Sequence, residues 1–107
     1  MSFQQTTLPI QGASGTTYRF TVYPWGTQFQ SFGAVYTVLR NNGGGRYSIL
    51  YVGQTGDMEE RFDDHHKQRC FDRNGKTHIG VLPEPNEQRR LAIESDLVNA
   101  YNPPCNG

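Results

Sequence analysis

Residues 33–53 read GAVYTVLRNNGGGRYSILYVG, and this stretch decides the fold. Residues 34–40 and 47–52 are rich in β-branched and aromatic residues, which favour extended strands. Between them residues 41–45 read NNGGG, and asparagine and glycine tolerate the positive φ angles of a tight turn. The sequence therefore predicts a β-hairpin in the middle of the chain.

Weaker signals predict one more strand on each side of this hairpin. Residues 17–23 alternate in polarity as a strand does, and a glycine-containing turn signal precedes them. Residues 77–82 are predicted to form a short strand that ends at Pro83.

Two helices are expected in the second half of the chain. The first runs from about residue 57 to 68, with Asp57 and Glu60 as a capping-box-like start. The second runs from Pro85 to about Tyr101, where two prolines follow and end it. We expect an α+β fold with a small central, mostly antiparallel sheet, flanking helices and an extra N-terminal β element.

Length and composition exclude several classes of protein. A chain of 107 residues makes one domain with a modest core. It is too rich in aromatic residues, at 12%, for a disordered chain, and no apolar run approaches the roughly 18 residues needed to cross a bilayer. A membrane protein, a collagen, a coiled coil and a large multidomain enzyme are thereby excluded. The first residues do not resemble a secretion signal, so we expect a cytoplasmic protein.

The charge is balanced overall but unevenly distributed along the chain. Ten basic and ten acidic residues give a net charge of 0, which does not suit a general binder of polyanions. Residues 1–56 carry three arginines and no acid, whereas residues 57–107 carry seven basic and ten acidic residues. A local positive face on the first half is therefore compatible with the neutral total.

The two cysteines, Cys70 and Cys105, are too few for a disulfide-rich scaffold. We expect two ordinary thiols in a reducing cytosol. The alternative is a module stabilised by zinc, in which His65, His66 and His78 are the candidate ligands beside the cysteines. The spacing of His65, Cys70 and His78 is not a standard zinc pattern.

Each expected helix has polar residues on the stripe that should face the core. In the first, Arg61 and His65 share helical spacing with Met58 and Phe62. Arg61 either extends from the edge of this stripe into water or belongs to a site.

In the second helix Glu94 lies within a stripe that runs from Leu91 to Tyr101. A carboxylate there costs several kcal/mol unless it meets a cation or hydrogen-bond donors. Glu94 either pairs with Arg61 or Arg90, or it faces a cleft and holds a metal ion. Tyr36 and Tyr51, on the two strands of the hairpin, either pack together or share that cleft.

Taken together, these positions resemble the GIY-YIG nuclease superfamily. The first signature appears as residues 33–36, GAVY, and the second as residues 51–53, YVG. The remaining family positions match in order and spacing: Arg61, His65, Glu94 and Asn106. The resemblance covers residues 32–107 and implies a GIY-YIG-like nuclease domain, which leaves residues 1–31 as an N-terminal β extension of unassigned role.

The resemblance implies a metal-dependent endonuclease that hydrolyses phosphodiester bonds in nucleic acid, and we expect this nucleic acid to be DNA. Glu94 would bind one Mg²⁺ (or Mn²⁺), which stabilises the leaving 3′ oxygen, and Arg61 would clamp the phosphate. Tyr36 would act as general base, directly or through His65. Tyr51 would position the water or the phosphate. Ionising a tyrosine of reference pKa about 10 at neutral pH costs about 4 kcal/mol, which nearby positive charge can lower.

Asn106 would support this site through hydrogen bonds. The sequence departs from the family at Gln54, where some members have a lysine. Because the total charge is also neutral, a homodimer or a partner protein would supply further affinity for DNA. The alternative function is a noncatalytic module of the same fold that binds nucleic acid or a protein partner.

Overall fold

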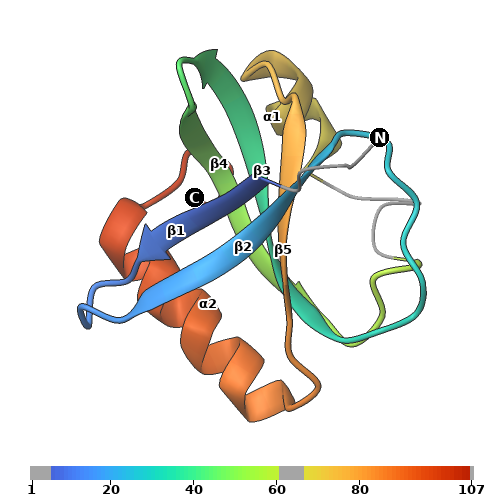
Figure 1. The fold of residues 1–107 in the computed structure, drawn as a ribbon, viewed down its shortest axis with the longest axis vertical. Coiled ribbons are helices and arrows are strands. Elements are labelled where there is room, and N and C mark those ends of the chain that lie inside the picture. Colours follow the sequence, from blue (N-terminus) through green and yellow to red (C-terminus); the bar gives the residue numbers. More distant parts are fainter. Residues whose placement is uncertain (1–5, 61–66, 107) are drawn as a thin grey trace.

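The computed structural model describes residues 6–60 and 67–106 and has an α+β fold (Figure 1). Five strands form one curled antiparallel sheet in the order β1-β2-β5-β3-β4. The elements are β1 (Thr6–Gln11), β2 (Thr17–Pro24), β3 (Ala34–Gly43), β4 (Arg46–Thr55), α1 (Gln68–Arg73), β5 (His78–Pro83) and α2 (Glu87–Tyr101).

The predicted hairpin is confirmed as β3 and β4, which pair from Ala34 opposite Thr55 to Gly43 opposite Arg46. The three glycines at its tip all have positive φ angles, between 63° and 86°, which explains why the sequence places glycine there. β5 pairs with the other side of β3, so β3 is a central strand and β4 lies at one edge of the sheet.

The N-terminal strands extend the same sheet, because β2 pairs with β5 and β1 pairs with β2. Asp96 of α2 fastens the turn between them: its carboxylate accepts hydrogen bonds from the Ser14 N–H (2.8 Å), the Ser14 hydroxyl (2.7 Å) and the Tyr18 hydroxyl (2.8 Å). The Ser14 hydroxyl, and then that of Tyr18, hold the pKa of Asp96 below its ordinary value. Residues 6–24 are therefore anchored at both the sheet and α2.

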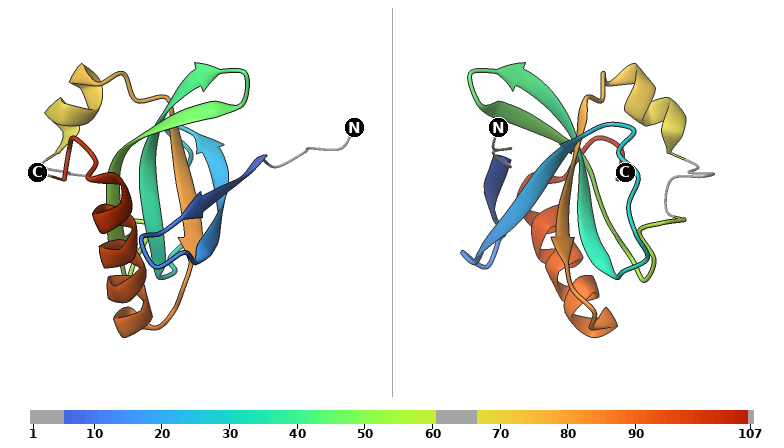
Figure 2. Two further views of the ribbon diagram at one scale, coloured as in Figure 1. Left: turned by 90° about the vertical axis from the view of Figure 1, so that its left-hand side faces the viewer. Right: turned by 45° about the vertical axis from the view of Figure 1, so that its right-hand side comes forward.

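Apolar side chains fill both faces of the sheet. On one face Ile93 and Leu97 of α2 pack with Val35 and Val52 of the hairpin. Successive residues of a strand point to opposite faces, so Tyr36 and Tyr51 lie on the other face. There they join clusters that include Phe71 of α1. Figure 2 shows α2 alongside the sheet, next to β4.

The expected helix over residues 57–68 is wrong in its first, described part. Residues 57–60 form a turn, and α1 begins only at Gln68. Met58 is buried as predicted, but in this turn, where its N–H donates to the Phe32 carbonyl at 2.9 Å. Neither α1 nor α2 is long and apolar enough to cross a membrane, and no other described helix is present.

Candidate functional site on the tyrosine face

Tyr36 and Tyr51 lie side by side on one face of the β3–β4 hairpin. Tyr36 is opposite Gly53 and Tyr51 is opposite Val38, and residues that are opposite in an antiparallel pair share a face. The two ring centroids are 6.0 Å apart and the ring planes are tilted by 36°. Tyr36 is fully buried and Tyr51 is half-buried.

Gly53 makes this arrangement sterically possible. A Cβ atom at this position would lie 2.5 Å from Tyr36 Cζ and 2.7 Å from Tyr51 Cε2, which is closer than packed atoms tolerate. The missing side chain therefore leaves room for the Tyr36 ring to cross over β4. This steric requirement explains why the last residue of the second signature, Gly53, is a glycine.

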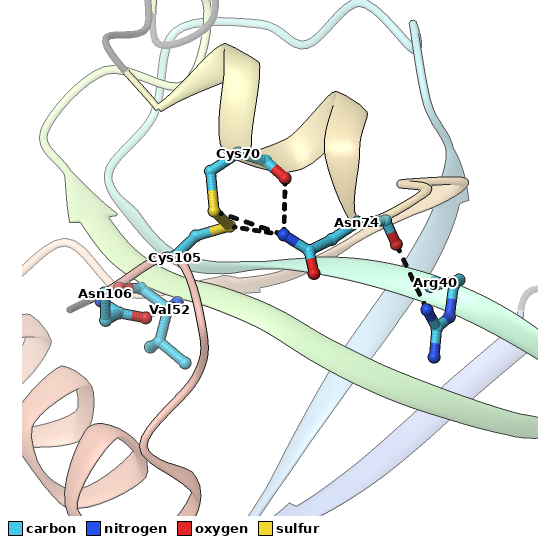
Figure 3. The surroundings of a disulfide bond; sticks show 6 residues. All are labelled: Arg40, Val52, Cys70, Asn74, Cys105 and Asn106. Carbon is cyan, nitrogen blue, oxygen red and sulfur yellow. Dashed lines mark hydrogen bonds between the residues drawn. A yellow bond between two sulfur atoms is a disulfide. The ribbon is translucent and has the colours of Figure 1, made fainter.

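Asn106 holds the outer side of β4. Its Oδ1 accepts a hydrogen bond from the Val52 N–H at 2.9 Å, and its Nδ2 donates to the Val52 carbonyl at 2.8 Å. The Cys105 N–H donates to the Leu50 carbonyl at 2.9 Å. The C-terminal segment thus pairs with the edge strand as a further strand would, and Asn106 fixes the backbone that follows Tyr51 (Figure 3).

The prediction of two ordinary thiols is wrong, because Cys70 and Cys105 form a disulfide with their Cα atoms 5.8 Å apart. It joins α1 to the C-terminal segment (Figure 3), and Asn74 Nδ2 donates to the Cys70 carbonyl at 2.8 Å beside it. The zinc alternative needed these sulfurs as thiolates, which a disulfide does not offer. The cytoplasmic location, which was expected from the N-terminal residues, stays a prediction.

The buried line of α2 differs from the predicted stripe. Leu91 and Tyr101 are 45% and 44% exposed, whereas Arg90, Ile93 and Leu97 are buried. The predicted stripe ran from Leu91 to Tyr101, so α2 is rotated about its axis from that expectation.

Arg90 can be buried because backbone and side-chain oxygens surround it. Its Nε donates to Gln54 Oε1 at 3.0 Å, and its Nη1 donates to the Glu84 and Pro85 carbonyls at 3.0 and 2.9 Å. These bonds replace the water that a guanidinium loses on burial. Arg90 thereby connects the start of α2 to the end of β4, a link that sequence spacing alone did not identify.

Glu94 is half-buried on α2, which packs on the opposite face of the sheet from the two phenol rings. It shares a helix face with Arg90, four residues earlier, and lies on the flank opposite Asp96, because two residues turn a helix by about 200°. Arg90 reaches Gln54 of β4, whereas Asp96 reaches the β1–β2 turn. Glu94 therefore lies on the flank of α2 that faces β4, on the other side of the sheet from the two phenol rings.

A cavity of about 460 Å³ opens on the tyrosine face. Trp25 and Phe29 are its aromatic walls, and Met58 and Ile79 line it from the core cluster that also holds Tyr36. Sequence reasoning missed this cavity. The only signal was a pair of aromatic residues in the polar loop after Pro24, and a loop sequence does not show what such residues pack against.

Compared with protein-family models, with curated proteins and with solved structures, the chain matches none of them. The resemblance to GIY-YIG nucleases therefore stays a prediction from the residues quoted above.

Not all of the predicted site residues can be placed. Arg61 and His65 lie outside the described residues, 6–60 and 67–106. Within those two ranges, no three His, Cys, Asp or Glu side chains gather closely enough to hold a metal ion. The structure brings together Tyr36, Tyr51 and the backbone that Asn106 holds.

Proposed function

We propose that the chain is a metal-dependent endonuclease that hydrolyses phosphodiester bonds in nucleic acid, with DNA as the expected substrate, at a site of GIY-YIG type. The observation that carries the proposal is the tyrosine pair. Two phenol rings 6.0 Å apart lie against a glycine that gives them room, and the strand beneath them is held by Asn106. Packing alone does not require all three features at once.

The burial of Tyr36 favours one of the two routes for proton transfer. A fully buried ring offers no surface to an attacking water, so the proton of that water would reach Tyr36 through a second group. The resemblance offers His65 for this step, with a reference pKa near 6.5. Tyr51 is half-buried, so it can position the water or the phosphate directly. Arg61 would clamp the phosphate oxygens.

Glu94 would be the protein ligand of a divalent cation. One carboxylate, together with waters and substrate oxygens, suits Mg²⁺, which is seldom enclosed by protein ligands alone. When bound, the ion supplies positive charge for the leaving 3′ oxygen.

A plasmid-nicking assay in Mg²⁺ tests the proposal. Glu94→Gln and Arg61→Ala should each lower the nicking rate by about a hundredfold or more, the usual effect of removing one group that stabilises transition-state charge. Glu87→Gln, at an exposed position in the first turn of the same helix, is the matched control and should nick at the wild-type rate. Nicking that survives both site substitutions overturns the proposal.

A noncatalytic module of the same fold is the second candidate. It is favoured by the full burial of Tyr36 and by the position of α2 on the other face of the sheet. In this case the protein binds nucleic acid or a protein partner, and binding is the same in Mg²⁺ and in EDTA. Wild-type protein that binds branched, single-stranded and duplex DNA and cuts none of them selects this candidate.

A further inference from the structure

The neutral chain concentrates positive charge at one end. Residues 40–46 at the hairpin tip carry two basic residues and no acid, and residues 67–76 carry four basic residues and one acid. We define the basic end by five of these cations, all exposed except the partly buried Lys76: Arg40, Arg46, Arg69, Arg73 and Lys76.

Contacts between the hairpin and α1 bring these cations into one region. Arg40 Nη1 donates to the Asn74 carbonyl at 3.4 Å, directly after α1, and the Asn41 N–H donates to Thr77 Oγ1 at 2.7 Å. Figures 1 and 2 show the hairpin tip and α1 at the same end of the molecule, and α2 begins at the opposite end, close to Glu84.

Two arginines of the basic end, Arg69 and Arg73, are exposed to an anionic ligand. The one carboxylate in residues 67–76, Asp72, is paired with Lys76. Arg69 and Arg73 are exposed and four residues apart, so they are neighbours on the same side of α1. Exposed cations grouped on one surface are the electrostatic pattern that binds a phosphate backbone.

The basic end continues into the cavity on the tyrosine face. The Trp25 ring, which forms one wall of that cavity, lies 5.9 Å from the ring of Phe71 on α1 and 5.1 Å from Lys76 Nζ. Beside the two aromatic walls, the amides of Gln28 and Gln68 and the carboxylate of Glu59 line the cavity. An aromatic wall with a few hydrogen-bonding groups suits an unstacked nucleobase, whereas a paired base inside a duplex cannot enter such a space.

We infer that the basic end and the Trp25 cavity together form a binding site for an unpaired stretch of nucleic acid. The cations hold its phosphates, and one unstacked base enters the cavity on the same face as Tyr36 and Tyr51. This inference rests on the proposed function for its class of ligand and narrows it to strands with unpaired nucleotides. Binding does not need the metal, so it can be tested separately from hydrolysis.

The first test measures the salt dependence of binding in EDTA, with a labelled single strand of about 12 nucleotides and its blunt duplex. Wild-type protein should bind the single strand more tightly than the duplex. Arg69→Gln combined with Arg73→Gln should reduce the slope of log Kobs against log[salt] by about 1.4, which corresponds to two lost phosphate contacts. Arg19→Gln combined with Arg89→Gln removes equal charge away from the basic end and should leave the slope unchanged.

The second test uses the fact that Trp25 is the single tryptophan of the chain. The single strand should quench its emission over the concentration range in which the label reports binding, and the duplex should not. Because this measurement needs no variant, a folding defect cannot imitate the result.

Three outcomes overturn the inference: equal affinity for single strand and duplex, equal slope changes in the two double variants, or binding that leaves Trp25 emission unchanged. The proposed function fails differently. A protein that gives the expected binding and quenching but cuts nothing in Mg²⁺ supports the inference and rejects the nuclease. A protein that nicks DNA while its emission and salt slope do not respond rejects the inference alone.

Discussion

Replacing Asn106 by aspartate tests how the edge of β4 is held. Asn106→Asp keeps the shape of the side chain and the oxygen that accepts from the Val52 N–H, but it removes the donor to the Val52 carbonyl. Val52 is fully buried, so its carbonyl would face a carboxylate oxygen with no donor. Losing one partner of a buried hydrogen bond costs about 1–3 kcal/mol, and we expect the free energy of unfolding to fall by about 2 kcal/mol at neutral pH.

The penalty of Asn106→Asp should disappear in acid. A protonated carboxyl can donate to the Val52 carbonyl again, so the folded chain binds this proton more tightly than the unfolded chain does. The pKa of the new carboxyl in the folded chain therefore lies above its unfolded value of about 3.9. The stabilising hydrogen bond is present below the unfolded pKa and is lost as the pH rises through the folded pKa.

Urea unfolding at pH 7 and pH 4 measures both effects. At pH 7 the midpoint should shift by about 1 M relative to wild type, and at pH 4 the shift should shrink. Asn86→Asp is the matched control, because Asn86 caps α2 by only accepting a hydrogen bond from the Arg89 N–H at 2.9 Å. An aspartate caps equally well there. An unchanged midpoint for Asn106→Asp at pH 7, or an equal loss in the control, would refute the reasoning.

Three further predictions concern other parts of the fold. Asp96 has a lowered pKa, so its hydrogen bonds to the β1–β2 turn stabilise the fold above the unfolded pKa near 4 and are lost in acid. The difference in the free energy of unfolding between wild type and Asp96→Asn should therefore shrink as the pH falls from 7 to 3. Urea unfolding midpoints measure this difference. Gly53→Ala should cost about 1–3 kcal/mol by displacing both tyrosine rings, whereas Gly56→Ala, whose Cβ would meet its nearest atom at 3.6 Å, should melt near wild type. Reducing the Cys70–Cys105 disulfide, which spans 35 residues, should remove about 3–4 kcal/mol and lower the melting temperature; two titratable thiols in purified, unreduced protein would contradict this.

The central hairpin could be predicted because its signals act over a few residues. Strand propensity and the glycine-rich tip fix the turn, and the turn fixes the register. That register places Tyr36 and Tyr51 on one face, so the core of the candidate site follows from the same local pattern. The contact of both rings with Gly53 is a further consequence of the same pairing.

The start of the first helix was predicted wrongly because aspartate serves a turn as readily as a helix cap. The Asp57 N–H donates to Thr55 Oγ1 at 3.0 Å, and Asp57 Oδ1 accepts from the Glu59 N–H at 3.0 Å. These local bonds compete with helix formation. The sequence pattern alone does not decide between a turn and a capped helix, because both use Asp57.

Long-range contacts decided the features that the sequence did not reveal. Cys70 and Cys105 lie close together because the C-terminal segment pairs with β4. The number of residues between the two cysteines does not predict this pairing. Arg90 is buried because carbonyls that precede α2 and Gln54 of β4 surround it. In both cases the deciding partner lies on another element.

The cations at the hairpin tip and on α1 form a local positive surface although the net charge of the chain is zero. At about 0.01 M salt the screening length is about 30 Å, comparable with the longest dimension of the molecule, 36 Å. Under these conditions the basic end of one copy attracts exposed carboxylates on another. We therefore expect copies to associate on desalting near pH 6.8, and to stay apart in ordinary buffer salt.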